Sequence, residues 1–249
     1  MATFNRSASA VVISTRPIGE SDLLVHLFTL EYGRLTCIAR GARRSRKRFM
    51  NALELFTQLS VRLARSRTSS MWRLDSASIL NCFEHIRADY SRYVYGNLCL
   101  ELVNLWQKEA ASEPGIYALL DWYLHVLSRG ISPVFTTIVF QVRLLKSAGV
   151  LPCLSRCSAC GKAMGKVTAF VNMTTGELAC SRCSKGSGSL SLSPGTLKVL
   201  ERISSDPLDR VVRLRLTQMQ VQEAWEYMRQ IHCANLQRQP CSYKFINLQ

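Results

Sequence analysis

Four of the chain's ten cysteines form two CxxC pairs, Cys157 with Cys160 and Cys180 with Cys183, with 19 residues between the pairs. A CxxC turn brings two thiolates within reach of one ion, and two such turns complete a tetrahedral shell of sulfurs about 2.3 Å from Zn²⁺. Four unrelated buried cysteines are the alternative, which the duplicated spacing disfavours. Four thiolates close the shell and leave no position for a substrate, so the pattern predicts a structural zinc ion.

The residues between the two pairs predict two short strands around a turn at 174–176, which would bring the second pair back beside the first. Gly161 directly follows Cys160 and suits a tight turn around the ligand sulfurs. Cys153 lies outside both turns, and we expect it to be a bystander because Zn²⁺ takes four ligands. The pattern as a whole predicts a zinc ribbon over about residues 153–186.

A second chemical feature is the basic segment RGARRSRKRF at 40–49. Mobile cationic segments bind phosphate backbones because cation–phosphate contacts release condensed counterions. A solvated loop without a ligand is the alternative, but the predominance of Arg and the shortage of nearby acid favour nucleic acid. The predicted contacts are Arg40, Arg43, Arg44, Arg46, Lys47 and Arg48 in the loop, with Arg62, Arg65 and Arg67 after it.

Aromatic side chains near this loop could add base stacking. Phe49, Phe56 and Trp72 each offer a ring, and aromatic rings stack on nucleobases with little regard to sequence. Large aromatic side chains are more commonly buried, however. We therefore expect each of the three to belong to the core rather than to a stacking platform.

Charge is distributed unevenly along the chain. The net charge is +15, and residues 1–80 contain 13 Lys and Arg against 5 Asp and Glu. The counts are 6 against 6 in residues 81–150 and 13 against 6 in residues 151–249. Two basic ends therefore flank a neutral middle, which predicts association with polyanions.

Motifs of catalysis are missing from the sequence. There is no GxxxxGK[ST] phosphate loop and no GxGxxG fingerprint, carboxylates are sparse, and the four histidines are scattered. We therefore expect a binding protein without catalytic residues rather than an enzyme. The amino terminus lacks a charged segment followed by a long apolar run, and no stretch approaches about 18 apolar residues, so we expect a cytoplasmic protein.

The predicted elements divide the chain into two kinds of structure. Short β-rich runs between residues 8 and 78 predict five strands and a small closed barrel of the OB or SH3-like type. Helical periodicity appears at 89–108, 116–127, 134–149, after Pro194 and at 217–234. We predict an α+β multidomain protein with an OB-fold barrel at 1–80 and a helical domain at 81–249 that contains the ribbon.

The order of these parts resembles the RecO family of bacterial recombination mediators. GESDLLVHLFTLEYGRLTCIARGARRSRKRF is similar to the family's acidic residue and Gly followed by an Ala-Arg-Arg loop. YGNLCLELVNL places Glu101 at the family's Glu-Leu position, and KSAGVLPCLSRCSACG is similar to its Gly, Pro and CxxCG run. CSYKFI looks like the family's Ser-containing tail. The resemblance extends along nearly the whole chain.

This resemblance implies an OB-fold domain, a helical domain and zinc at the four paired cysteines. It also implies a protein of the RecF pathway that binds single- and double-stranded DNA and anneals complementary strands without ATP. Its partners would be RecR and the C-terminal tail of single-strand binding protein. It would also have a functional link to RecA, because with RecR it would help to load RecA on strands that are coated by single-strand binding protein. Such a protein would be cytoplasmic and associated with the nucleoid.

Other functions fit the same residues. An RNA-binding zinc-ribbon protein of translation or transcription would also combine an OB barrel with a ribbon, and a preference for RNA would identify it. A protein-recruiting scaffold would bind no nucleic acid at physiological salt. A metal-dependent nuclease is disfavoured because the sequence lacks a carboxylate cluster.

Overall fold

The computed structural model describes residues 3–66, 71–184, 190–246 and 248. The chain separates into two compact units, Met1–Arg129 and Gly130–Gln249. The first unit contains the barrel and three helices, and the second contains the ribbon and four helices. In the described residues, no helix is both long and apolar enough to cross a membrane.

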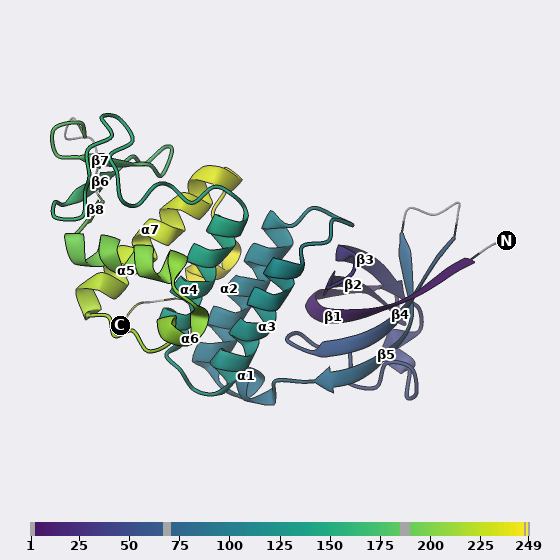
Figure 1. Cartoon of the computed structure of the whole chain (residues 1–249). Helices are drawn as coiled ribbons and strands as arrows, with labels where there is room; N and C mark the ends of the chain where they lie inside the picture. The colour runs from purple at the N-terminus through teal and green to yellow at the C-terminus, as the bar shows by residue number, and fades with distance from the viewer. Residues whose placement is uncertain (1–2, 67–70, 185–189, 247, 249) are drawn as a thin grey trace. The chain divides into compact units, whose positions relative to one another are not determined.

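The barrel consists of β1 (Thr3–Ile18), β2 (Asp22–Thr29), β3 (Gly33–Ala39), β4 (Gln58–Ser66) and β5 (Trp72–Asn81). These strands close in the order β1-β2-β3-β5-β4, and β1 curves along the barrel (Figure 1). All pairings are antiparallel except the short parallel contact between β3 and β5. The predicted OB-like barrel of five strands is confirmed.

Side-chain alternation explains why these segments are strands. Along β3, Gly33, Leu35, Cys37 and Ala39 are buried and the residues between them are partly exposed. This two-residue period places one face of the strand in the barrel core. A bulge between Val12 and Ser14 in β1 shifts the register with β2, which lets a strand of 16 residues pair with both neighbours.

Three helices complete the first unit: α1 (Glu84–Ala88), α2 (Tyr90–Trp106) and α3 (Pro114–Ser128). Asp89 begins α2 as its N-cap, because its side chain accepts a hydrogen bond from the backbone N–H of Arg92. The bounds of α2 and α3 agree with the predicted helices to within two residues. Both helices pack on each other, and α2 also contacts the barrel.

The β2–β3 turn packs closely against the chain segment that follows α2. Gly33 has φ of +67°, and a Cβ atom there would lie 1.7 Å from the carbonyl oxygen of Ala111, so only glycine fits. The next residue, Arg34, donates hydrogen bonds to the Gln107 carbonyl at 3.1 Å and to Asn104 Oδ1 at 3.2 Å. The barrel is thereby joined to the end of α2 within the first unit.

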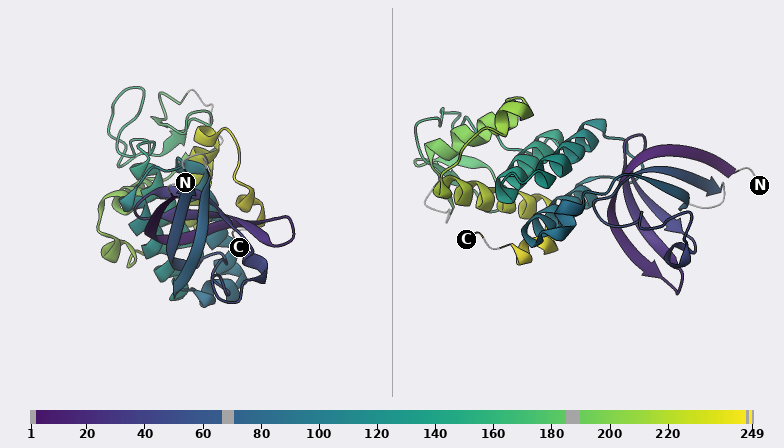
Figure 2. Two further views of the ribbon diagram at one scale, coloured as in Figure 1. Left: turned by 90° about the vertical axis from the view of Figure 1, so that its right-hand side faces the viewer. Right: turned by 90° about the horizontal axis from the view of Figure 1, so that it is seen from below.

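The second unit is built on α4 (Pro133–Ser147), α5 (Pro194–Ser205), α6 (Leu208–Val211) and α7 (Gln218–Leu236) (Figure 2). Residues 135–142 of α4 are all buried, as expected for a helix that is surrounded by other elements. A capping box formed by Thr217 and Gln220 begins α7. Helices α4, α5 and α7 pack against one another.

Three short strands follow α4 in the chain: β6 (Ala169–Val171), β7 (Leu178–Cys180) and β8 (Ser191–Leu192). They form a sheet in the order β7-β6-β8. The predicted pair of strands around a turn is confirmed, while β8 is an addition that the sequence pattern did not indicate. The predicted domain boundary between residues 80 and 81 stays a prediction about which segments fold independently. In the structure, α1 to α3 pack into the same compact unit as the barrel.

Candidate metal centre and nucleic-acid interface

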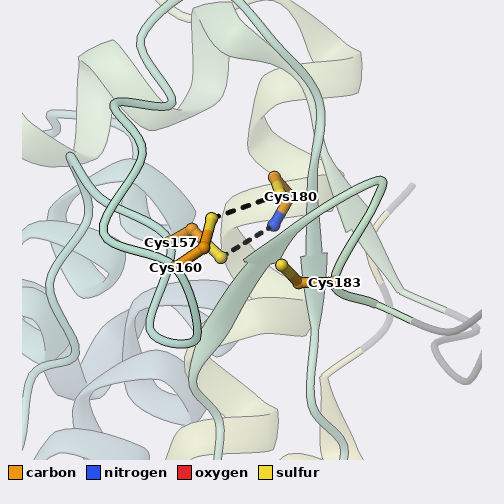
Figure 3. A group of neighbouring side chains, drawn as sticks. All are labelled: Cys157, Cys160, Cys180 and Cys183. Atoms are coloured by element: carbon orange, nitrogen blue, oxygen red, sulfur yellow. Dashed lines mark hydrogen bonds between the residues drawn. The ribbon is translucent and has the colours of Figure 1, made fainter.

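The four paired cysteines meet at one point of the second unit (Figure 3). Their sulfur atoms all lie within 4.8 Å of one another, and Cys160 Sγ lies 3.8 Å from Cys180 Sγ. A tetrahedral zinc shell with bonds of about 2.3 Å places its sulfurs about 3.8 Å apart. The predicted residues are therefore brought together in a geometry that could hold a metal ion.

Backbone hydrogen bonds position the two cysteine turns. The N–H of Gly161 donates to the Cys157 carbonyl at 2.9 Å, with φ of +69° at the glycine, and the N–H of Cys183 donates to the Cys180 carbonyl at 2.9 Å. The N–H of Ser158 donates to the Leu178 carbonyl at 2.9 Å and ties the first turn to β7. Each turn is thus closed by a local backbone bond, and pairing of the first turn with β7 brings the two turns together.

The pKa values of the clustered thiols indicate that four thiolates need a cation between them. The backbone N–H of Cys180 donates to Cys157 Sγ at 3.4 Å and is the main cause that lowers the pKa of Cys157 to about 6. Hydrogen bonding with Cys160 raises the pKa of Cys183 to about 12. One thiol is thus easily ionised while another keeps its proton, because neighbouring thiolates repel each other. Four thiolates become stable together when a divalent ion balances them, so this donor set fits Zn²⁺.

Cys153 is not one of the four clustered cysteines. Its exposed thiol lies 3.5 Å from the Ser155 hydroxyl, and this hydrogen bond is the main cause that lowers its pKa. Cys37 and Cys99 are buried in the first unit as small apolar side chains.

The basic loop projects its cations while apolar residues hold it on the barrel. Arg40, Arg43, Arg44, Arg46, Lys47 and Arg48 are all exposed. In the same β3–β4 connection, Ala42, Phe49, Ala52 and Leu53 are buried in the barrel core. A short 3₁₀ turn, η1 (Ala42–Arg44), lies within it. The sequence predicts a mobile segment, whereas burial of these four side chains anchors the loop at several points.

Hydrogen bonds to the β1–β2 turn fix the start of the loop. Asp22 accepts a bond from the N–H of Gly41 at 2.8 Å, and this bond is the main cause that lowers the pKa of Asp22. Arg43 donates to the Glu20 carbonyl at 3.2 Å, and Arg44 pairs with the Glu20 carboxylate at 3.3 Å. Because Arg44 and Glu20 are both well exposed, this ion pair contributes little to stability.

The cations that were predicted to contact DNA differ in whether another side chain engages them. Within the described ranges, no acidic side chain lies within ion-pair distance of Arg40, Arg46, Lys47 or Arg62. Arg62 is exposed on β4, and Arg65 is partly buried with its guanidinium 5.4 Å from the centre of the Trp72 ring. Arg67 lies outside the described residues. Cations without acidic partners remain available for phosphate groups.

The three candidate aromatic rings belong to the core. Phe49, Phe56 and Trp72 are 4%, 0% and 9% exposed, which agrees with the expectation that none is a free stacking platform. Trp72 is instead part of a column that the sequence did not reveal. Its ring stacks on Tyr32 with centroids 6.2 Å apart, and the Arg6 guanidinium lies 5.1 Å from the Tyr32 ring centre. With Arg65 above Trp72, this column adds two ordered guanidinium groups to the barrel.

Comparison with known proteins adds an independent result. The family model described as recombination protein O N terminal matches residues 1–83, and the one described as recombination protein O C terminal matches residues 87–244. The DNA repair protein RecO of Desulfosudis oleivorans is 32% identical over 221 residues, which cover 85% of this chain and 85% of that protein.

Two further relatives support the same assignment. The DNA repair protein RecO of Syntrophobacter fumaroxidans is 34% identical over 208 residues, which are 83% of this chain and 82% of that protein. That of Myxococcus xanthus is 36% identical over 174 residues, 70% of each chain. Since the matches run through both the barrel and the helical region, the chain belongs to the RecO family of recombination and DNA repair proteins.

Proposed function

We propose that this protein binds single- and double-stranded DNA through the basic loop of the barrel and anneals complementary strands without nucleotide hydrolysis. It acts in DNA repair as a recombination mediator, in the cytoplasm at the nucleoid. The observation that carries the proposal is the row of six exposed cations at 40–48 on an OB-like barrel in a member of the RecO family.

Electrostatics accounts for annealing without a chemical step. Two DNA strands repel each other, and a protein that neutralises their phosphates lowers this repulsion while the base edges stay free to pair. Arg46 and Lys47 are exposed and have no ion pair among the described residues, so they are suited to backbone contacts. Binding should therefore be nearly independent of sequence and should fall steeply with salt.

Zinc at the four cysteines has a structural role in this proposal. The ion would be held by Cys157, Cys160, Cys180 and Cys183 and would supply a cross-link between the two turns. We propose no catalytic role for it, and we propose that the protein is not an enzyme.

The proposed partners are RecR and single-strand binding protein. RecA is linked to the protein functionally, because the protein would help to load RecA on DNA strands. An acidic tail with an apolar end needs an apolar hollow with cations at its rim. One hollow of about 600 Å³ in the second unit lies beside Trp225 and Tyr243. Glu223 and Glu226 also line it, and its one lining cation among the described residues, Arg229, is paired with Glu226 at 2.6 Å. Its charge does not suit an acidic tail, so we do not assign the tail of single-strand binding protein to this hollow.

The test is annealing of two labelled complementary DNA strands by purified protein without ATP, across a salt series and with or without single-strand binding protein. The variant R43Q/R46Q removes two loop cations, and K108Q/R129Q is a matched control that removes two exposed cations from the helical part of the first unit. We expect the loop variant to lower the salt slope of single-strand binding by about 1.4, since each lost phosphate contact contributes about 0.7.

Two results would reject the proposal. The first is wild-type protein that binds DNA but does not accelerate annealing. The second is a loop variant that matches the control in affinity and salt slope, which would exclude the loop as the contact. Tighter binding to RNA than to DNA of the same sequence would favour the RNA-binding alternative.

A further inference from the structure

The zinc ribbon carries an excess of positive charge. Its described residues 154–184 contain four cations, Arg156, Lys162, Lys166 and Arg182, and a single acid, Glu177. All four cations are exposed, and in this described range none has an acidic side chain within ion-pair distance. The second basic region of the sequence is therefore partly concentrated in one small element.

Two of these cations belong to the cysteine turns. Lys162 follows Cys160 by two residues, and Arg182 lies between Cys180 and Cys183. Because the four sulfurs lie within 4.8 Å of one another (Figure 3), the two turns that carry these cations meet at one point of the ribbon.

Lys166 extends this group along the loop that leads to β6. The N–H of Met164 donates to the Ser155 carbonyl at 2.9 Å and the N–H of Val167 donates to the Met164 carbonyl at 3.1 Å, so the loop is ordered by backbone bonds. Val167, next to Lys166, is 38% exposed. The segment that carries Lys166 therefore lies at the surface with a defined backbone path, so this cation is accessible to a phosphate group.

The ribbon cations could instead only neutralise the metal cluster, because four thiolates around one Zn²⁺ carry net negative charge. Arg156 fits that role best, since its guanidinium donates to the Gly161 carbonyl at 3.3 Å and stays beside the first turn. Within the described residues, the side chains of Lys162, Lys166 and Arg182 donate no such hydrogen bond to the cysteine turns, and all three are exposed. Neutralising the charge of the thiolate cluster from a distance does not require three cationic side chains that extend into solvent.

We propose that Lys162, Lys166 and Arg182 form a second phosphate-binding surface, which holds one DNA strand while the barrel loop holds another. This inference rests on the proposed function, because it assigns the second strand of the annealing reaction to the ribbon. Each copy of the protein then has two strand-binding surfaces, one in each compact unit.

The experiment is a two-strand capture assay with the zinc-loaded full chain. A single DNA strand is immobilised and saturated with protein, free protein is washed away, and retention of a labelled non-complementary strand is measured across a salt series. The variant is K162Q/K166Q/R182Q. The matched control, K198Q/R213Q/R215Q, removes three exposed cations from the helical part of the second unit that also have no ion pair among the described residues. Zinc content is measured for every protein.

We expect the ribbon variant to bind the first strand like the wild type and to retain the second strand between about tenfold and about a hundredfold more weakly at low salt. The salt slope for the second strand should fall by about 2, which is three contacts at about 0.7 each. The control should match the wild type. A gain-of-charge variant, Glu177→Lys, should strengthen second-strand retention, and it tests the surface independently of any loss of folding.

Two outcomes would overturn the inference. Second-strand retention that is equal in the ribbon variant and the wild type would show that these three cations do not hold the second strand. The second outcome is a ribbon variant that contains less zinc than the wild type and that retains the second strand as well as the wild type once zinc is restored. This result would show that the three cations only stabilise the cysteine cluster. Failure of wild-type protein to bind the first strand would instead reject the proposed function, so the two failures are distinguishable.

Discussion

The basic loop and the zinc ribbon display similar cations on different supports. In the loop, Ala42, Phe49, Ala52 and Leu53 are buried in the barrel core and hold the chain by hydrophobic contact. The ribbon has strands of two or three residues and relies on four cysteine sulfurs within 4.8 Å. One surface thus depends on packing and the other on four clustered thiols that could hold a metal ion, and such a cross-link would let a small segment present charge without a large core.

This difference means that the two surfaces should fail under different treatments. Metal removal should release the ribbon and spare the loop, because the loop cations are anchored by apolar burial. Loss of a loop anchor should have the opposite effect.

The largest expected effect is that of Cys180→Ser. Cys180 is a buried member of the cluster, and three thiolates with a hydroxyl hold Zn²⁺ far more weakly than four thiolates. We expect loss of bound zinc and loss of amide hydrogen-exchange protection in peptides from 155–184, with unchanged protection at 40–57. Cys153→Ser, which removes an exposed thiol outside the cluster, is the control. Protected ribbon peptides in the Cys180 variant would show that the ribbon folds without metal.

Truncation of a loop anchor should have the next largest effect. Phe49 is 4% exposed in the barrel core, so Phe49→Ala should lower the free energy of unfolding of the first unit by about 3 kcal/mol. The neighbouring Met50 is 64% exposed, and Met50→Ala should change stability little. Urea unfolding followed by hydrogen exchange measures both, and zinc content should stay constant. Equal stability of the two variants would show that the loop is not anchored by Phe49.

A buried histidine should make the second unit sensitive to acid as well as to metal removal. Burial lowers the pKa of His232 in α7 from 6.5 to about 3. As the pH falls below 6.5, the unfolded chain binds a proton that the folded chain does not, so stability is lost on acidification between these two values. From pH 7 to pH 5 the expected loss is about 2 kcal/mol.

The variant His232→Gln separates this effect from release of zinc by acid, because both proteins contain the same four cysteines. The pH dependence of unfolding of the second unit should be smaller in the variant by that amount. Identical pH profiles for the two proteins would mean that His232 is not the group responsible.

The sequence alone predicted the features that depend on neighbours in the chain. Two CxxC turns and a glycine specify the candidate metal centre locally, and the alternation in β3 specifies a strand. Helix bounds were accurate where a capping residue such as Asp89 or Thr217 marks the start.

Features that depend on distant residues were not predictable in this way. Arg6, Tyr32, Arg65 and Trp72 come from different parts of the barrel, and only the strand register brings them into one column. The anchoring of the loop was missed for a similar reason: burial of Phe49 was expected from its residue type, but charge dominates the segment, and nothing local indicates that Ala42, Ala52 and Leu53 enter the same core. The two-residue strand β8 exists because β6 offers it a free edge.

The smallest expected effect concerns the only acidic side chain that forms an ion pair with a loop cation in the described structure. Glu20 is well exposed and pairs with Arg44 at 3.3 Å, so Glu20→Gln should leave the melting temperature unchanged. The same change frees Arg44 for phosphate and should raise affinity for single-stranded DNA by about threefold at low salt.

Glu177→Gln in the ribbon is the matching change for the other surface, and it should raise only second-strand retention, because Glu177 belongs to the ribbon and not to the loop. Filter binding for the first strand and the capture assay for the second measure the two effects separately. If each substitution altered both affinities equally, net charge alone would govern binding, and neither the packed loop nor the cysteine ribbon would act as a distinct contact surface.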